Sequence, residues 1–131
     1  AKGRPYGLVR IGEAAEQPLA EFAAFVKRVL SCPGVRFSDA GKPVRKVAVG
    51  GGSCGSEIGD VIAAGCDTFV TADLKYNHFE EAKYRGLNLI DAGHFETENP
   101  VCDVLEGILR EAFPEIPVFR ARAHRDETQF L

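Results

Sequence analysis

A histidine and a glutamate lie four positions apart in the chain, at His94 and Glu98. On an α-helix, residues with this spacing share one face and lie one turn apart. An imidazole nitrogen together with a carboxylate oxygen suits a divalent metal ion. The pair therefore predicts part of a metal site. The alternative interpretation is an exposed pair at a helix start, where the helix dipole favours a glutamate.

Two ligands do not complete such a site, because tight metal sites use three or four. Asp73 and Asp91 each follow an expected strand, and they are either further ligands or caps of the helices that follow. His78 and His124 are the other histidines, and no motif surrounds either of them. Nothing separates Asp73 from Asp91 as a general base, so no catalytic residue is assigned.

A glycine-rich segment follows the expected strand at residues 45–49. Its pattern, Gly50-x-Gly52-x-x-Gly55, matches the dinucleotide fingerprint, in which backbone approaches a pyrophosphate at a helix N-terminus. A tight strand-to-helix turn explains the same glycines without a ligand. Short length argues against a nicotinamide cofactor, which would need a catalytic domain as well. The anion or phosphate hypothesis assigns Gly51, Gly52, Ser53 and Gly55.

The cysteines are Cys32, Cys54, Cys66 and Cys102, and none of them forms a C-x-x-C motif. We expect small buried thiols in a reducing compartment. Cys54 lies in the glycine segment near a helix N-terminus, a position that can lower a thiol pKa and produce a nucleophile. That function requires a neighbouring base such as His94. The alternative is a small side chain in a glycine turn.

Strand-like and helix-like segments alternate along the chain, with short connections. The expected strands are 6–12, 35–37, 45–49, 67–71, 87–90 and 116–119, and the expected helices are 18–31, 56–64, 76–85 and one that begins near Thr97 or Asn99. The last helix has an apolar stripe that comprises Val101, Val104, Leu105, Ile108, Leu109, Ala112 and Phe113. This order predicts a single α/β domain with a mostly parallel sheet and helices on both faces.

In such folds, ligands bind beyond the carboxyl ends of the strands. The glycine segment, residues 71–73 and residues 91–94 each follow one of the expected strands. We therefore expect these three segments to meet at one edge of the sheet.

The composition is that of a folded soluble domain: 131 residues, 45% hydrophobic, and 16 basic against 19 acidic residues, for a net charge of −3. The acidic balance argues against binding to DNA. No apolar run approaches about 18 residues, which argues against a membrane span. We expect a cytoplasmic protein. The sequence contains no methionine, which favours a portion of a longer protein.

Three segments, residues 46–56, 67–76 and 89–98, together resemble the Nif-three-like family, whose members are named as homologues of a type 2 GTP cyclohydrolase I. The similarity extends from about Tyr6 to the C-terminus. It implies a two-lobed α/β protein with a dinuclear metal centre between the lobes, assembled into a ring-shaped oligomer. The family motif G-H-x-x-x-E falls on His94 and Glu98, which it identifies as metal ligands. The other family ligands, a His-His pair and an aspartate, belong to an N-terminal half.

By this resemblance, residues 1–131 form the C-terminal lobe of a longer protein whose N-terminal lobe is absent. The implied function is a metal-dependent hydrolase that acts on a nucleotide or a related heterocycle. Its cofactors would be divalent ions, two per site, of Zn, Fe, Mn, Co or Ni. Its partners would be a nucleotide substrate, the missing lobe and further copies of itself, and the isolated chain would be inactive. The alternative function is a non-enzymatic metal-binding module or a regulatory module that binds a partner.

Overall fold

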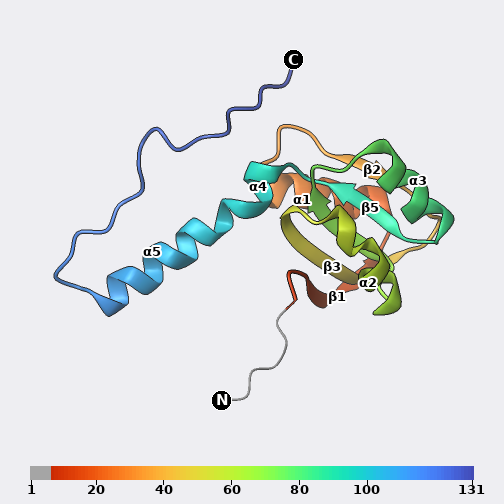
Figure 1. Ribbon diagram of the computed structural model, residues 1–131, viewed down its shortest axis with the longest axis horizontal. Coiled ribbons are helices and arrows are strands. Elements are labelled where there is room, and N and C mark those ends of the chain that lie inside the picture. The colour runs from red at the N-terminus through yellow and green to blue at the C-terminus, as the bar shows by residue number, and fades with distance from the viewer. Residues whose placement is uncertain (1–6) are drawn as a thin grey trace.

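The first two thirds of the chain form a five-stranded sheet and the helices that connect its strands (Figure 1). The structure is a computed structural model, and it describes residues 7–131. The elements in order are β1 (Arg10–Gln17), α1 (Leu19–Val29), β2 (Arg36–Ser38), β3 (Val44–Ser53), the short 3-10 helix η1 (Gly55–Glu57), α2 (Ile58–Ala63), β4 (Thr68–Ala72), α3 (Tyr76–Tyr84), β5 (Asn88–Asp91), α4 (His94–Glu98) and α5 (Pro100–Ala112).

The strand order across the sheet is β1-β3-β4-β5-β2. The three central strands are parallel, with Val47 opposite Thr68 and Thr68 opposite Asn88. The edge strands β1 and β2 run antiparallel to β3 and β5. The helices α2 and α3 provide the crossovers that parallel neighbours require. The predicted α/β class and mostly parallel sheet are thus confirmed, with antiparallel strands at both edges.

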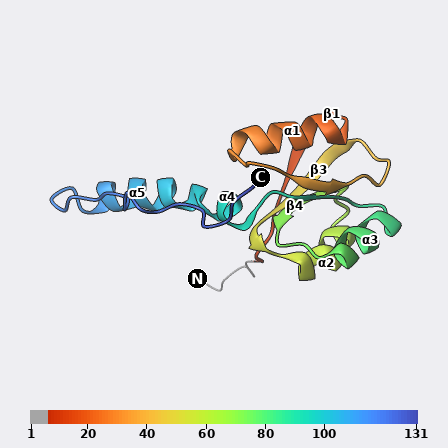
Figure 2. The ribbon, with the colours of Figure 1, turned by 90° about the horizontal axis from the view of Figure 1, so that it is seen from above.

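Helices cover both faces of the sheet, with α1 on one side and α2 and α3 on the other (Figure 2). Successive strand residues point to opposite faces, so neighbouring positions belong to different cores. Val47 and Val70 pack in the cluster beneath α1, whereas Ala48 and Phe69 pack in the cluster beneath α2 and α3.

Three expected boundaries at the start of the chain and in the glycine segment differ from the structure. The first strand is β1 at Arg10–Gln17 rather than 6–12, and Tyr6 lies outside the described residues. Strand β3 continues to Ser53, because Ser53 pairs with Ala72 of β4 after a register shift. The first glycines of the segment are therefore strand, and η1 precedes α2. The expected helix at 56–64 therefore begins later, at Ile58, and the Ser56 hydroxyl donates to the Glu57 carboxylate.

Helix α5 forms where the sequence predicts a helix, but it projects away from the sheet (Figures 1 and 2). None of its residues is buried. The large apolar side chains of its stripe, from Val101 to Leu109, are 42–59% exposed. No helix among residues 7–131 has the length and apolarity needed to cross a membrane.

The expected strand at 116–119 is wrong, since these residues adopt no strand in the structure. A strand requires a neighbour for its backbone hydrogen bonds. The segment follows α5 away from the sheet, whose edges are β1 and β2. The chain then returns to the body of the molecule, where its last residues reach Gly34.

The four cysteines are free thiols. Cys32, Cys54 and Cys66 are buried as predicted, and Cys102 is half-buried. Burial, followed by the charge of the nearby Glu96 carboxylate, raises the pKa of the Cys32 thiol. Burial also raises the pKa of Cys66. These side chains therefore behave as small apolar groups.

Candidate functional site

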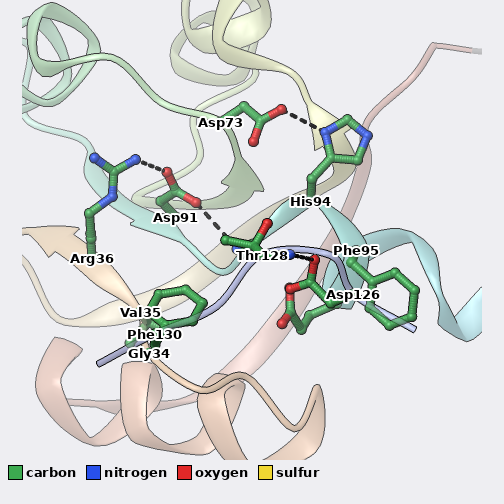
Figure 3. A pocket seen from close by; sticks show the side chains of 12 residues that line it. Gly34, Val35, Arg36, Asp73, Asp91, His94, Phe95, Asp126, Thr128 and Phe130 are labelled. Atoms are coloured by element: carbon green, nitrogen blue, oxygen red, sulfur yellow. Dashed lines mark hydrogen bonds and ion pairs between the residues drawn. The ribbon is translucent and has the colours of Figure 1, made fainter.

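The three segments expected at one sheet edge do meet there. Gly52 at the end of β3, Asp73 after β4 and His94 after β5 lie around one another. The three strands are parallel neighbours, so their carboxyl ends lie side by side. Figure 3 shows Asp73 and His94 facing each other from two of these ends.

The predicted pair of His94 and Glu98 is formed. Gly93 has φ +83°, and this left-handed conformation, which glycine adopts freely, lets the chain turn from β5 directly into α4. His94 is the first residue of α4 and Glu98 the last, and His94 Nε2 lies 3.3 Å from Glu98 Oε2. Both side chains are about half exposed, so a ligand or a second protein segment can reach them.

Asp73 holds the other nitrogen of the same imidazole, because its Oδ2 lies 2.6 Å from His94 Nδ1. Asp73 has φ +54°, a conformation that aspartate tolerates better than most residues do. The hydrogen bond to Asp73 is the main cause that raises the pKa of His94, and the charges of Asp73 and Glu98 add to it. Desolvation acts in the opposite direction. In the neutral ring, a proton on Nδ1 leaves the Nε2 lone pair available to a metal.

Gly52 leaves the space that Glu98 and His94 occupy. A Cβ at position 52 would lie 2.4 Å from Glu98 Oε1 and 3.1 Å from His94 Nε2, and φ is +66°. The Gly52 amide donates to the Thr97 hydroxyl at 2.9 Å, which ties β3 to α4. Packing against Glu98 and His94 is therefore enough to explain a glycine at position 52. The assignment of anion binding to residues 51–55 stays a prediction.

The remaining histidines are engaged elsewhere. His78 Nδ1 accepts a hydrogen bond from the Lys75 amide at 3.2 Å, at the start of α3, and its ring lies against Gly55. His124 Nε2 lies 3.2 Å from Asn99 Oδ1. Within residues 7–131, no three His, Cys, Asp or Glu side chains are arranged to hold a metal.

Asp91 joins the strand ends to one another. It is buried, and its carboxylate accepts hydrogen bonds from the amides of Leu74 at 3.0 Å and Gly93 at 3.2 Å and pairs with the guanidinium of Arg36. The bond to Gly93 lies at the start of α4. This arrangement fits the capping alternative for Asp91.

Cys54 lies in the core rather than in the cavity at the strand ends. Its thiol contacts the Gly51 carbonyl at 3.5 Å, and its amide donates to the Thr71 hydroxyl. The side chain is 4% exposed. The residues around it thus match a small side chain in a tight turn.

A cavity of about 470 Å³ opens beside His94 and Asp73 (Figure 3). Sequence reasoning missed several residues that line it, namely Arg36 of β2, Glu96 of α4, and Asp126 and Phe130 of the C-terminal segment. Of these, only Glu96 could have been suggested by the sequence, because it lies between His94 and Glu98 along the chain. The others come from segments without a motif, and only folding brings them here.

The sequence model described as Duf34/NIF3 (NGG1p interacting factor 3) matches residues 3–127. The chain belongs to this family. A Nostoc relative named "GTP cyclohydrolase 1 type 2 homolog" is 40% identical over 95 residues, which are 70% of this chain and 36% of the relative. A Bacillus subtilis relative with the same name is 43% identical over 91 residues, which are 68% of this chain and 24% of that protein.

Solved structures of the family have the same fold. Staphylococcus aureus protein SA1388 is 31% identical with a TM-score of 0.87, over 96% of this chain and 43% of that one. Reduced HcgD from Methanocaldococcus jannaschii is 26% identical with a TM-score of 0.66, over 80% of this chain and 43% of that one. The chain thus spans about a quarter to a third of these curated relatives and less than half of these solved chains.

Proposed function

We propose that this chain contributes His94 and Glu98 to the metal site of a metal-dependent hydrolase that acts on a nucleotide or a related heterocycle. The observation that carries the proposal is the pairing of these side chains at the strand ends, with Asp73 on the far nitrogen of the imidazole. The relatives named as GTP cyclohydrolase homologues support the substrate class.

The donor set fits a divalent transition metal. A neutral imidazole and a carboxylate are ligands that Zn, Fe, Mn, Co and Ni accept. A carboxylate on the second ring nitrogen is a common feature of metal-binding histidines, because it orients the ring and raises its basicity. Asp73 has this position.

The set is also incomplete, since residues 7–131 present no group of three ligands. The proposal therefore requires further ligands from another part of a longer polypeptide or from a second copy of the chain. A dinuclear centre, with its two ions, belongs to that completed site.

When bound, such an ion lowers the pKa of a water ligand and polarises the bond to be hydrolysed. The chain's own residues have defined tasks around it. Asp73 holds the His94 ring, Gly52 leaves room for the Glu98 carboxylate, and Thr97 fastens α4 to β3. Gly51, Ser53 and Gly55 remain candidates for contacts to a phosphate group of the substrate.

Elemental analysis tests the metal proposal on this chain and on a longer polypeptide that contains it. We expect bound metal in the longer form, and we expect His94→Ala and Glu98→Gln to remove it. Glu80→Gln changes an exposed glutamate of α3 and serves as the matched control. Metal that persists in both site variants would overturn the proposal.

Turnover distinguishes the enzyme from its alternative. Conversion of GTP by the metal-loaded long form, lost in His94→Ala, supports the hydrolase. Stoichiometric metal without turnover of any nucleotide tested would favour the metal-binding or partner-binding module. The family description, an interacting factor, is compatible with that second function.

A further inference from the structure

A carboxylate without a partner lines the cavity beside the metal-ligand pair. Glu96 is only 8% exposed, and it borders the 470 Å³ cavity. Gly93 makes room for it, since a Cβ at position 93 would lie 2.2 Å from Glu96 Oε2. Its charge also helps to raise the pKa of the buried Cys32 thiol, after burial itself.

Nothing in residues 7–131 satisfies this carboxylate. It forms no ion pair and accepts no hydrogen bond there, and it does not cap α4, the helix on which it lies. Among the described residues, every side-chain oxygen or nitrogen that is fully shielded from solvent has a hydrogen-bond partner. The unpaired oxygens of Glu96 therefore keep some access to solvent, and the spaces that Glu96 borders are this cavity and a neighbouring one of about 350 Å³. A buried carboxylate is costly without donors, so the cavity offers an acceptor to a ligand.

The surroundings favour a positively charged or donor-rich ligand. Asp73, Asp91 and Asp126 add three more carboxylates to the lining. The cavity's one arginine, Arg36, is committed to Asp91 and to the Leu74 carbonyl. His94, the other basic group of the lining, lies between the carboxylates of Asp73 and Glu98, so little positive charge is left for an anion.

Aromatic rings border the same space. Phe95 comes from α4 and Phe130 from the C-terminal segment, which lies against Gly34 (Figure 3). A planar cation gains from contact with an aromatic face in addition to its hydrogen bonds. Carboxylate acceptors beside rings therefore match a flat group with neighbouring N–H donors.

We propose that this cavity binds a planar ligand group with paired N–H donors, such as an amidinium, a guanidinium or an amino-substituted heterocycle, and that Glu96 accepts those donors. The proposal assigns a binding role to a residue that is not among the proposed metal ligands. It goes beyond the hydrolase proposal and does not need it, because the contacts come from residues of this chain alone.

The test uses the whole 131-residue chain with a chelator present, so that metal plays no part. Benzamidine is the planar amidinium probe, and benzoate is the anion of nearly the same shape. We expect benzamidine to shift the backbone amide NMR signals of residues 93–96 in a saturable way. We expect no saturable shift with benzoate.

Glu96→Gln removes the charge and half of the acceptor capacity, so we expect benzamidine to bind about tenfold more weakly or worse. The control variant Glu80→Gln changes an exposed glutamate on α3. Its affinity for benzamidine should be within about twofold of that of the unchanged chain. Asp126→Asn, a change in the C-terminal segment, tests the same cavity if Glu96→Gln does not fold, and it should weaken benzamidine several-fold.

Equal affinity of Glu96→Gln and the unchanged chain would overturn the proposal. The proposal would also be overturned if benzoate bound the unchanged chain as tightly as benzamidine does, and this comparison requires no variant. Because metal is absent throughout, failure here leaves the metal measurement untouched, and failure of the metal measurement leaves this result standing.

Discussion

Asp73 Oδ2 lies 2.6 Å from His94 Nδ1, although the two residues are 21 positions apart and belong to different strand ends. The contact depends on the left-handed backbone of Asp73, with φ +54°, and on the turn at Gly93. It leaves His94 Nε2 directed to Glu98, at 3.3 Å from its carboxylate. The geometry of the candidate site therefore rests on the conformation of two single residues.

Replacing Asp73 by Asn should lower the pKa of His94 toward the ordinary value of histidine, about 6.5. Asparagine also tolerates φ +54°, so the backbone is preserved while the acceptor charge is lost. A histidine NMR titration of the metal-free chain measures the change. An unaltered His94 pKa would show that Asp73 does not hold the ring in solution.

The same raised pKa predicts a pH dependence of stability. Protonated His94 stabilises the fold, and this contribution is complete below the ordinary pKa of about 6.5 and is lost as pH rises through the folded pKa. The difference in unfolding free energy between the unchanged chain and Asp73→Asn should therefore be larger at acidic than at alkaline pH. Asp60→Asn, at an exposed position of α2, is the control in denaturant titrations.

Replacing Gly52 by Ala should destabilise the chain by about 1 kcal/mol or more. The new Cβ would meet the Glu98 carboxylate at 2.4 Å, in a backbone with φ +66°. Gly59→Ala is the matched control, because nothing lies within 4 Å of its added Cβ and the residue is helical. That control should be neutral or stabilising by up to about 1 kcal/mol. Equal free energies of unfolding for the two variants would contradict the argument.

Replacing Asp91 by Asn should cost about 1–3 kcal/mol, because a buried acceptor of the Leu74 and Gly93 amides is exchanged for a group that is part donor. The exposed Asp103, which pairs with Arg120 at the surface, provides the comparison. Asp103→Asn should cost less than about 1 kcal/mol. Denaturant-induced unfolding followed by circular dichroism measures both. Similar losses would mean that the carboxylate at position 91 does not join the strand ends.

The apolar stripe of α5 predicts self-association of this chain, because exposed apolar patches of this kind are usually covered by a partner. Sedimentation should show an average mass that rises with protein concentration. Ile108, which is 55% exposed, can be changed to Glu, and this variant should shift the chain toward monomer without lowering its unfolding free energy. Glu111→Gln, on the same helix, should leave the mass unchanged. A monomer at every concentration would contradict the prediction.

Local sequence patterns predicted much of the fold. Alternation of short apolar strands and amphipathic helices indicated the α/β class, and the positions of Asp73 and Asp91 after their strands correctly indicated that these segments meet at one edge of the sheet. The His94–Glu98 pair followed from helical spacing alone, because both residues belong to one turn of helix. Short-range periodicity was sufficient for these features.

Longer-range features escaped prediction for a common reason. Whether β3 stops at Val49 or continues to Ser53 depends on pairing with β4. Residues 116–119 have strand-like composition but no neighbouring strand with which to pair. The apolar periodicity of α5 predicted a helix correctly, yet it contained no information on whether anything covers the stripe.

By itself, then, the sequence determined most of the elements, their order and a His–Glu pair within one helical turn, since these depend on neighbours along the chain. Tertiary structure alone decided that Asp73 reaches His94, that Gly52 makes room for Glu98, and that Glu96 faces a cavity completed by the C-terminal segment. Such contacts join distant segments. They depend on sheet register and on a few left-handed residues, which spacing along the chain does not reveal.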